Sequence, residues 1–405
     1  MNLSRRSFVS GGIAAIAAAR PRRVIGANER IRVGLIGSGS NGEDHLKALI
    51  GLADQDNVEI AAVSDVYQPR LERAAAIALA RPYKDYRALL EHRGLDYVVI
   101  SSPNHWHAKM AIDALDAGLH VYCEKPLAHT IPECLAVRRK VKESKTLLQC
   151  GVQGMSDETY ETAARHIADG AIGKPIVAQV DYSRNYVDDL WLEKHDASAD
   201  PDLNLDWNAF LGPAPKRPWD PDRFFSWRRY WDYSGGIPTD LLIHRLARVI
   251  KACGLTAPSR VVAMGGKYVF KDSAAEIPDT FNAMLEYPEG MTVLLTSTMA
   301  NRSPVRHTIR GHHATLEFTD EGFAITPEEE FSNQTSSLSY RRTGGESIAL
   351  HHHNLHDAIR NGAPLKCDID LGFNSSLACL IAVESFRTRK YLAWDPVDER
   401  VVEAA

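Results

Sequence analysis

The sequence lacks several patterns that would assign it to common classes of protein. No GxSxG element occurs in its 405 residues, so a serine hydrolase has no support. Basic and acidic residues are mixed throughout, and the net charge of -5 gives no electrostatic footprint for nucleic acid or an anionic membrane surface. We find no repeat, low-complexity tract or transmembrane segment. These absences favour a small, roughly neutral substrate.

Cysteine is also scarce and shows no framework. The six cysteines form no CxxC pair and no tight spacing pattern: Cys123, Cys134, Cys150, Cys253, Cys367 and Cys379. Most of them are therefore expected to be core thiols and not disulfide or metal partners.

The first residues carry an export pattern. Residues 4–9 (SRRSFV) form a twin-arginine motif, and the small apolar run at 11–19 is too short to span a bilayer. Cleavage after Ala19 and after Ala27 both fit, and residues 1–27 are taken as the Tat signal peptide. The plain alternative is a disordered basic N-terminus. Because this route exports folded proteins, often with cofactor in place, we expect a periplasmic protein that holds its cofactor tightly.

Beyond residue 28, short apolar runs alternate with segments of helical periodicity. The runs lie at 31–36, 58–64, 97–100, 120–123 and 147–150, and the helical segments around 45–50, 71–80, 108–117 and 131–143. This alternation is typical of a parallel sheet covered on both faces. It predicts an α/β fold that starts with a doubly wound Rossmann domain over residues 28–150.

The texture changes after Gly151. A helix near 159–169 is followed by longer alternating segments at 176–183, 260–270, 280–287, 291–297, 308–311 and 315–318. They predict a C-terminal α/β domain over residues 151–405 with a large, mainly antiparallel open sheet. The turn at 287–290 predicts a hairpin, and the Trp/Pro-rich stretch at 206–236 is expected to be irregular and functional.

A glycine-rich turn follows the first predicted strand. Gly37, Gly39 and Gly42 form GxGxxG between a buried strand and a helix, the context in which this motif binds dinucleotides. The three glycines permit, in order, the tight turn, the approach of the backbone to pyrophosphate and close packing of helix on strand. Ser38 and Asn41 belong to the same turn and are candidate cofactor contacts.

Asp65 ends the next predicted strand, 23 residues after Gly42. Its carboxylate is placed to accept hydrogen bonds from the adenosine ribose and would repel a 2′-phosphate. This favours NAD over NADP, although Arg70 lies near enough to weaken the preference.

Two further predicted strands end in polar segments, Ser-Ser-Pro-Asn-His-Trp-His at 101–107 and Glu-Lys-Pro at 124–126. Both lie at the carboxyl edge of the sheet, where open α/β folds bind ligands. The candidate cofactor contacts in these segments are Ser102, Asn104, His107, Glu124 and Lys125.

With these motifs, and with Gly235-Gly236 followed by Asp240 and His244, the chain resembles the glucose-fructose oxidoreductase, inositol dehydrogenase and rhizopine catabolism (Gfo/Idh/MocA) family. The resemblance covers nearly the whole mature chain, since residues 356–362 and 394–395 also look like that family's C-terminal domain. It implies a two-domain enzyme in which Lys125, Asp240 and His244 surround the nicotinamide and contact substrate. It also implies a homo-oligomer.

The chemistry of these three residues fits hydride removal from an alcohol. A neutral imidazole at His244 can take the hydroxyl proton, and the Lys125 ammonium can stabilise developing alkoxide charge. Asp240 and His244 are spaced i, i+4 at the start of an apolar helix and project from one face. Each also has a plain structural explanation, as a helix-dipole acid, a solvated lysine and a core histidine; together, in the family's order, they favour catalysis.

Other candidates are less specific. Residues 227–233 combine aromatic faces with polar donors, as sugar sites do, and Arg228 and Tyr233 are the preferred substrate contacts, although the aromatic rings could equally be packing under a loop. Gln153 follows the last strand of the first domain and is a further candidate. The histidines at positions 312, 313, 351, 352, 353 and 356 have no cysteine or acid to complete a ligand set, so no metal is expected.

The sequence thus predicts an NAD(P)-dependent oxidoreductase that moves a hydride between a bound nicotinamide and a secondary hydroxyl of a sugar, polyol or glycoside. The alternative is a redox-neutral glycoside hydrolase that acts by oxidation, elimination, addition and reduction. A non-catalytic sugar-binding protein would be expected to lose Lys125, Asp240 or His244, and all three are present.

Overall fold

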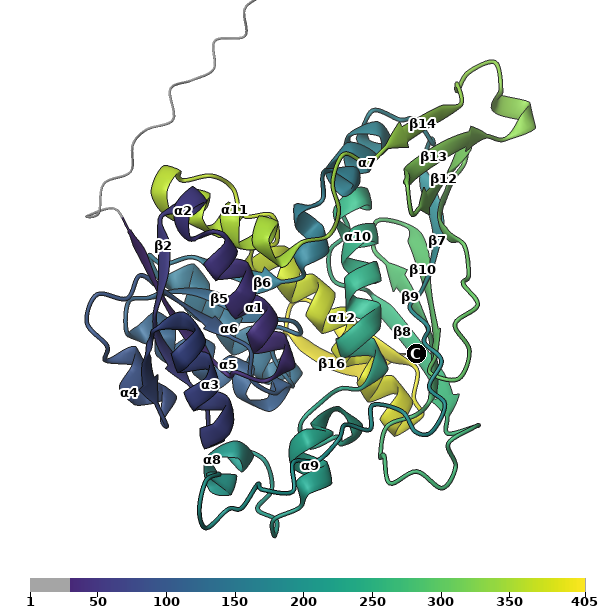
Figure 1. Cartoon of the computed structure of the whole chain (residues 1–405). Coiled ribbons are helices and arrows are strands. Elements are labelled where there is room, and N and C mark those ends of the chain that lie inside the picture. Colours follow the sequence, from purple (N-terminus) through teal and green to yellow (C-terminus); the bar gives the residue numbers. More distant parts are fainter. Residues whose placement is uncertain (1–29, 405) are drawn as a thin grey trace, which may run out of the picture.

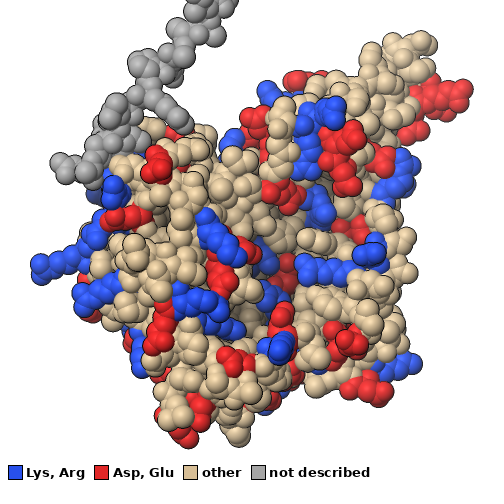
Figure 2. Space-filling model, viewed as in Figure 1, with Lys and Arg blue, Asp and Glu red and all other residues tan. Residues whose placement is uncertain are grey.

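The computed structural model describes residues 30–404, which fold into two lobes, each built on one sheet (Figure 1). The predicted signal peptide, residues 1–27, lies outside the described residues. Lys and Arg are interspersed with Asp and Glu over the face seen in Figure 2, which is hollowed between the lobes.

The first sheet is parallel, with six strands in the order β3-β2-β1-β4-β5-β6. Its strands are β1 (Ile31–Ile36), β2 (Val58–Ser64), β3 (Arg81–Tyr83), β4 (Tyr97–Ile100), β5 (His120–Glu124) and β6 (Leu148–Gly151). Its helices are α1 (Ser40–Gly51), α2 (Ala53–Asp56), α3 (Gln68–Ala78), α4 (Tyr86–Leu90), α5 (Asn104–Asp116) and α6 (Ile131–Glu143). The predicted doubly wound Rossmann fold is confirmed.

The predicted strands of this sheet agree closely with the structure because they are apolar on both faces. β1, β2 and β4 have the predicted bounds, and β5 and β6 differ by one residue. Strand β3 was not predicted, because only three mostly exposed residues form it and Pro82 interrupts any alternation. The predicted helix at 131–143 is α6, which starts with a reciprocal Thr130–Glu133 capping box.

The second sheet has ten strands in the order β14-β13-β12-β11-β7-β10-β9-β8-β15-β16. Its strands are β7 (Pro175–Asp181), β8 (Arg260–Gly266), β9 (Thr280–Tyr287), β10 (Met291–Thr298), β11 (His307–Gly311), β12 (Ala314–Thr319), β13 (Gly322–Pro327), β14 (Leu338–Arg341), β15 (Leu392–Asp395) and β16 (Arg400–Glu403). All pairs are antiparallel except β7 with β10, so the predicted mainly antiparallel sheet is confirmed.

One face of this large sheet is covered and the other is not. Buried and half-buried residues alternate strictly along β10, as a sheet with one covered face requires. The covering helices are α7 (Glu158–Ala168), α10 (Ile243–Cys253) and α12 (Ile369–Thr388), and they lie on the side of the large sheet that faces the first domain (Figure 1). Met264 and Met284 are 67% and 53% exposed on the other face. The predicted hairpin joins β9 to β10 through Gly290, whose φ of +83° suits glycine.

The stretch at 206–236, predicted to be irregular, holds short helical turns. They are α8 (Trp207–Leu211), α9 (Pro221–Phe225) and the 3₁₀ turn η3 (Trp227–Arg229). The side chains of Asp206 and Asp220 cap the first two. A second correction concerns the helix expected at Asp240, which begins with a π-helical turn, η4 (Pro238–Leu242), before α10 continues as α-helix. Such turns are rare and frequently occur at functional sites.

Two C-terminal helices join the lobes. Helix α12 packs against β8 of the large sheet and against α6 and β6 of the first domain. By length and composition it could cross a membrane, but most of it is buried in the protein, as in a core helix. Helix α11 (Ile348–Asn361) lies on the first domain beside α1 (Figure 1), and its Leu355 belongs to the core under β1. The predicted boundary at residue 150 is therefore crossed by α11. The 3₁₀ turns η2 (Gln153–Ser156) and η5 (Glu329–Phe331) complete the elements.

Candidate active site

A cleft of about 1160 Å³ opens at the carboxyl edge of the first sheet. Its walls come from the ends of β1, β2, β4 and β5 and from the segment that holds α8, α9 and η3. Eleven of the sequence-predicted residues line it: Gly37, Gly39, Asn41, Asp65, Ser102, Asn104, His107, Glu124, Lys125, Arg228 and Asp240. Residues from two separate stretches of chain thus meet around one cavity.

The glycine turn is tightly fitted to its surroundings. Gly37 has a φ of +89°, and a Cβ there would lie 2.7 Å from the carbonyl oxygen of Ser101. A Cβ on Gly42 would lie 2.1 Å from the carbonyl oxygen of Gly37. At Gly39 a Cβ would meet nothing nearer than 3.7 Å, so the space above this residue is free for a ligand. The N-terminus of α1 follows directly, without a side-chain cap, and faces the cleft.

Asp65 holds this turn in place. Its Oδ2 accepts a hydrogen bond of 2.7 Å from the backbone N–H of Ser38, and its Oδ1 accepts one of 2.8 Å from that of Tyr67. The carboxylate also lines the cleft, where its remaining lone pairs can accept hydroxyl protons. Arg70 lines the same wall, with its guanidinium over the ring of Phe224 at 5.2 Å.

Two buried polar atoms near the cleft have no hydrogen-bond partner among residues 30–404. They are the Oδ1 of Asn104 and the Oγ of Ser38. Buried polar atoms are rarely left unpaired, so such atoms beside a cleft suit a bound polar ligand. Asn41 donates to the Oγ of Ser101, and both ring nitrogens of His107 approach carbonyl oxygens, of Pro126 at 2.7 Å and Ser102 at 2.9 Å. His107 therefore ties the two strand-end segments together. An uncapped helix N-terminus, an open glycine and these orphan atoms fit a dinucleotide.

Asp240 anchors two cations at the inner end of the cleft. Its Oδ1 accepts a hydrogen bond from the Nε of Arg228 at 3.1 Å and lies 3.5 Å from the Nζ of Lys125. Lys125 also donates to the backbone carbonyl of Asp240 at 3.1 Å, and Ser234 donates to its Oδ2 at 2.8 Å. Burial alone would raise the pKa of Asp240, but the charges of Lys125 and Arg228 outweigh burial and lower the pKa below its usual value. The carboxylate stays ionised and fixes the position of the lysine.

His244, the second residue of α10, lies close to this cluster but is not among the residues that line the cleft. Its half-buried imidazole contacts the ring of Tyr182 edge-on, at 6.0 Å between centroids. Burial lowers the pKa of His244 to about 3, and the nearby charge of Lys125 adds to this effect. The imidazole is therefore neutral in the ordinary pH range and can accept a proton.

Glu124 has a partner that the sequence did not reveal. Its Oε1 lies 3.0 Å from the Nε2 of His45, a fully buried residue of α1. Burial would raise the pKa of Glu124, but the hydrogen bond from His45 and the charge of Lys125 lower the pKa to about 2.

Besides His244, two predicted substrate residues do not line the cleft. Tyr233 is fully buried and packs against the rings of His105, Phe210 and Tyr230. This corrects the preference for Tyr233 as a sugar contact, because its neighbours in the chain turn it into an aromatic core. Gln153 begins η2 and does not line the cleft.

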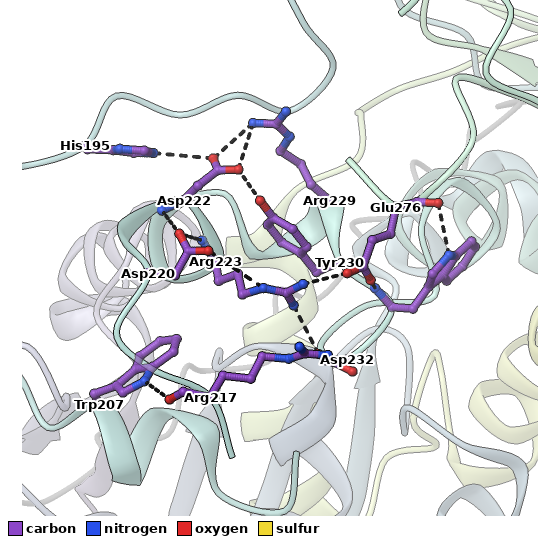
Figure 3. A network of polar contacts seen from close by, with 11 residues as sticks. His195, Trp207, Arg217, Asp220, Asp222, Arg223, Arg229, Tyr230, Asp232 and Glu276 are labelled. Atoms are coloured by element: carbon purple, nitrogen blue, oxygen red, sulfur yellow. Dashed lines mark hydrogen bonds and ion pairs between the residues drawn. The ribbon is translucent and has the colours of Figure 1, made fainter. Parts of the chain in front are cut away.

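The Trp/Pro-rich segment lines the cleft and is held together by ion pairs and hydrogen bonds. Arg223 binds Asp232 at 3.0 Å and Glu276 at 2.6 Å, and Asp222 accepts hydrogen bonds from Arg229 and Tyr230 (Figure 3). The segment is fastened to the first domain, where the ring nitrogens of His105 and Trp106 both approach the carbonyl oxygen of Phe210. The aromatic run singled out at 227–233 supplies the lining residue Trp227. Phe224 and Lys194 also line the cleft and were not predicted; Phe224 was signalled only by the aromatic content of its segment, and Lys194 lies outside that segment.

The candidate histidines and cysteines form other arrangements. Within residues 30–404 no group of three or more His, Cys, Asp or Glu side chains is arranged to hold a metal ion. The six cysteines are free thiols, and all but Cys253 are buried.

The fold and the cleft together define a two-domain chain whose first domain has the Rossmann fold of dinucleotide-binding proteins. Residues 31–152 match the family model described as "Oxidoreductase family, NAD-binding Rossmann fold", and residues 214–394 match the model for the C-terminal alpha/beta domain of the same family. A second model of that C-terminal domain matches residues 158–260. The chain belongs to the Gfo/Idh/MocA family.

Curated relatives match part of the chain. The inositol 2-dehydrogenase of Salmonella typhimurium (strain LT2) is 34% identical over 160 residues, which is 38% of this chain and 46% of that protein. The scyllo-inositol 2-dehydrogenase (NAD(+)) of Bacillus subtilis (strain 168) is 32% identical over 148 residues, 36% of this chain and 43% of that protein. Glycosyl hydrolase family 109 protein 1 of Shewanella sp. (strain ANA-3) is 38% identical over 116 residues, 26% of this chain and 25% of that protein. The matched stretch thus spans less than half of each relative.

Solved structures match nearly the whole fold. A levoglucosan dehydrogenase in complex with NADH and levoglucosan superposes with a TM-score of 0.70 at 20% identity, covering 90% of this chain and 99% of that one. The WlbA dehydrogenase from Bordetella pertussis, in complex with NADH and UDP-GlcNAcA, gives 0.67 at 20% identity, with 90% and 99% covered. These similarities establish the shared two-domain fold.

Proposed function

We propose that this protein is an NAD-dependent oxidoreductase that acts on a secondary hydroxyl of a sugar, polyol or glycoside. The observation that carries the proposal is the meeting of Lys125 and Asp240 at 3.5 Å, from different lobes, in a cleft that begins at the glycine turn. The relatives named as inositol dehydrogenases and the fold shared with levoglucosan dehydrogenase support the same substrate class.

The residues of the chain divide the work of this reaction. The turn at Gly37–Gly42 and the carboxylate of Asp65 hold the dinucleotide, and when bound NAD⁺ supplies a hydride acceptor. Lys125, fixed by Asp240, holds the reacting hydroxyl and stabilises negative charge on its oxygen. His244 accepts the hydroxyl proton because its imidazole is neutral. The segment around α8 and α9 keeps bulk water from the cleft.

A direct assay tests this proposal. The purified protein is denatured and its supernatant is assayed for NAD(H) and NADP(H). The folded protein is then supplied with NAD⁺ and myo-inositol, scyllo-inositol or levoglucosan, and NADH formation is followed by absorbance. Released or bound NAD and sugar-dependent NADH formation are expected. Absence of both a bound dinucleotide and any binding of added NAD⁺ would refute the proposal.

A second candidate is redox-neutral glycoside cleavage, in which oxidation, elimination, addition and reduction follow one another. It is supported by the similarity to glycosyl hydrolase family 109 protein 1. Release of aglycone from nitrophenyl glycosides without net NADH formation would favour this candidate over the dehydrogenase.

We also propose that the protein is exported by the Tat route and retains its cofactor after export. Outside the cytoplasm little free nicotinamide is available, so the cofactor should be regenerated in the catalytic cycle. Replacing both Arg5 and Arg6 with lysine is expected to leave the protein in the cytoplasm of a Tat-competent bacterium. Cell fractionation and immunoblotting measure this, with the unaltered protein as reference. Equal periplasmic yield of the two proteins would contradict export by this route.

Finally, we propose that the protein forms a homo-oligomer through the uncovered face of the large sheet. Exposed apolar side chains lie on that face, including Met264 and Met284. The double variant Met264→Lys/Met284→Lys is expected to have a lower mass in solution than the parent, as measured by size-exclusion chromatography with light scattering. A monomeric parent protein would count against this proposal.

A further inference from the structure

An unbroken chain of buried polar side chains leads away from the cleft. It begins at Glu124, whose Oε1 lies 3.0 Å from the Nε2 of His45. The Nδ1 of His45 lies 2.9 Å from the Nε2 of His352, whose Nδ1 lies 3.2 Å from the hydroxyl of Tyr97. The same hydroxyl lies 2.9 Å from the Nε2 of His356.

The chain ends at the protein surface. The Nδ1 of His356 lies 2.7 Å from the Oδ2 of Asp56, and the Oδ1 of Asp56 lies 2.7 Å from the Nδ1 of His353. The side chain of His353 is 48% exposed, whereas every link between it and Glu124 is at most 3% exposed. The cleft and the solvent on the far side of the first domain are thus connected by successive hydrogen bonds. We call the seven residues from Glu124 to His353 the histidine chain.

The fold assembles this chain from distant parts of the sequence. His45 comes from α1, Asp56 from α2 and Tyr97 from β4. Helix α11 lies across them beside α1 and α2 (Figure 1) and supplies the remaining histidines. His352 and His356 are four residues apart, so they project from the same face of α11.

The histidine chain has one more hydrogen bond than its neutral side chains have protons to donate. From Glu124 to Asp56 it contains five hydrogen bonds, and each needs one proton. With both carboxylates ionised, the three neutral imidazoles and the one phenol between them supply four. One extra proton completes the chain. The extra proton lies on Glu124 or on Asp56, depending on which tautomer the three imidazoles adopt. When it moves from one carboxylate to the other, the donor and acceptor of every hydrogen bond in the chain are exchanged.

The reaction proposed above produces such a proton. Oxidation of a secondary alcohol breaks a C–H and an O–H bond. The hydride leaves with the C–H electron pair to the nicotinamide, and the O–H electron pair forms the second bond of the carbonyl group. The remaining proton is first taken by the protein, and it must reach solvent before the next turnover. In reduction the same proton must enter.

We propose that the histidine chain conducts this proton between Glu124 at the cleft and His353 at the surface. Glu124 lines the cleft beside Lys125 and is close enough to His244 for the two charges to interact, so a water in the cleft can pass the proton from His244 to it. The inference rests on the proposed oxidoreductase function. It assigns a role to the buried histidines, which that function alone leaves without one.

The groups that surround the histidine chain disfavour a histidine that stays protonated, so a proton on the chain is passed on and not retained. His352 is packed by the rings of Tyr122 at 4.4 Å and His45 at 5.1 Å, and His351 and His356 flank it on α11. Burial lowers the pKa of His352 well below its usual value, and burial also lowers the pKa of His356, against the hydrogen bond and charge of Asp56. Arg360 and His353 are the other charged or titratable groups that act on His356.

A matched pair of tyrosines allows a sharp test. Tyr97 and Tyr122 are both fully buried on neighbouring strands, and both rings pack against His352. The hydroxyl of Tyr97 is a link of the chain, whereas that of Tyr122 has no partner among the described residues. Tyr97→Phe cuts the chain and keeps the ring; Tyr122→Phe removes a similar hydroxyl from outside the chain.

The first measurement needs no substrate. The ring nitrogens of ¹⁵N-histidine are followed by NMR as the pH is lowered. In the parent protein and in Tyr122→Phe, protonation at the His356 end is expected to shift His352 and His45 in the same step. In Tyr97→Phe these two residues should no longer respond. The proposal fails if His45 and His352 do not respond in the parent protein, and this result does not depend on whether Tyr97→Phe folds. It also fails if the two histidines respond equally in the parent protein and in Tyr97→Phe.

The second measurement uses turnover. With NAD⁺ and myo-inositol or levoglucosan as probe, NADH formation is followed by absorbance and proton release by a pH indicator in a stopped-flow instrument. In Tyr97→Phe, proton release in dilute buffer should lag behind NADH formation by at least about 10-fold and recover as imidazole buffer is added. Equal lags in the two variants would overturn the proposal. A parent protein that turns over neither sugar counts against the proposed function, while the NMR titration still decides the chain.

Discussion

Replacing His244 with alanine is expected to lower kcat by at least about 100-fold, the usual contribution of a positioned general base. The dissociation constant for NAD⁺ should remain within about threefold of the parent value, because the glycine turn and Asp65, which hold the dinucleotide, are unchanged. Steady-state kinetics with NAD⁺ and an accepted sugar measure the first quantity, and fluorescence titration with NADH measures the second.

The pH dependence of the parent enzyme checks the same assignment. Burial holds the pKa of His244 at about 3, so this imidazole becomes protonated and inactive as a base only when the pH falls toward that value. The profile of kcat/KM should therefore show no loss attributable to His244 between about pH 5 and 8. An acid limb near the ordinary histidine pKa of about 6.5 that disappears in His244→Ala would contradict this expectation.

His166 provides a control for this experiment. It lies on α7, where its ring packs against Phe323 at 5.9 Å, and it does not line the cleft. His166→Ala should retain parental kcat. If His244→Ala loses NAD⁺ binding together with turnover, His244 serves the cofactor site and not proton transfer.

The glycine turn carries the second large expected effect. Gly42→Ala should raise the dissociation constant for NAD⁺ at least about 100-fold, or about 2.7 kcal/mol. The added Cβ would lie 2.1 Å from the carbonyl oxygen of Gly37, so the backbone of the turn has to move. Isothermal titration calorimetry or NADH fluorescence measures the change, and thermal unfolding reports the accompanying loss of stability.

Gly39→Ala separates the cofactor from the fold. Gly39 has a φ of -69°, and its added Cβ would meet nothing within 3.7 Å, so the melting temperature should stay unchanged. Binding of NAD⁺ should still weaken, because the pyrophosphate has to approach this backbone closely. Gly51→Ala, where the Cβ meets open space, should alter neither property. Parental NAD⁺ affinity in both Gly39→Ala and Gly42→Ala would place the dinucleotide elsewhere.

Local patterns gave a large part of the first domain. Strand β1, the turn after it and α1 follow from a short apolar run, three glycines and helical periodicity, all within about 20 residues. Asp65 follows from the same logic, because it ends the adjacent strand β2. These features depend on neighbours in the chain, and so the sequence alone predicts them.

Other predictions depended on packing that the chain pattern does not encode. Tyr233 and Arg228 come from the same aromatic stretch, yet one is sealed in a core and the other lines the cleft. Both residues are of types that bind sugars. Only the path of the surrounding segment decides that Arg228 reaches the cleft and Tyr233 does not. The helix at Asp240 was predicted, but its π-helical turn was not, because such turns leave no periodic trace.

The histidines of α11 show the same division most clearly. In the sequence they form a polar run without a ligand set, and nothing near them in the chain explains why they should be buried. Their partners are distant in the sequence: His45 and Asp56 lie 307 and 300 residues from the histidines that they contact, and Tyr97 lies 259 residues from His356. The sequence by itself determined the Rossmann domain, its glycine turn and the types of residue available for chemistry, because periodicity and turn preferences act over short distances. Only the tertiary structure decided which lobe α11 covers and which side chains reach the cleft, because burial of apolar faces pairs elements regardless of their separation along the chain.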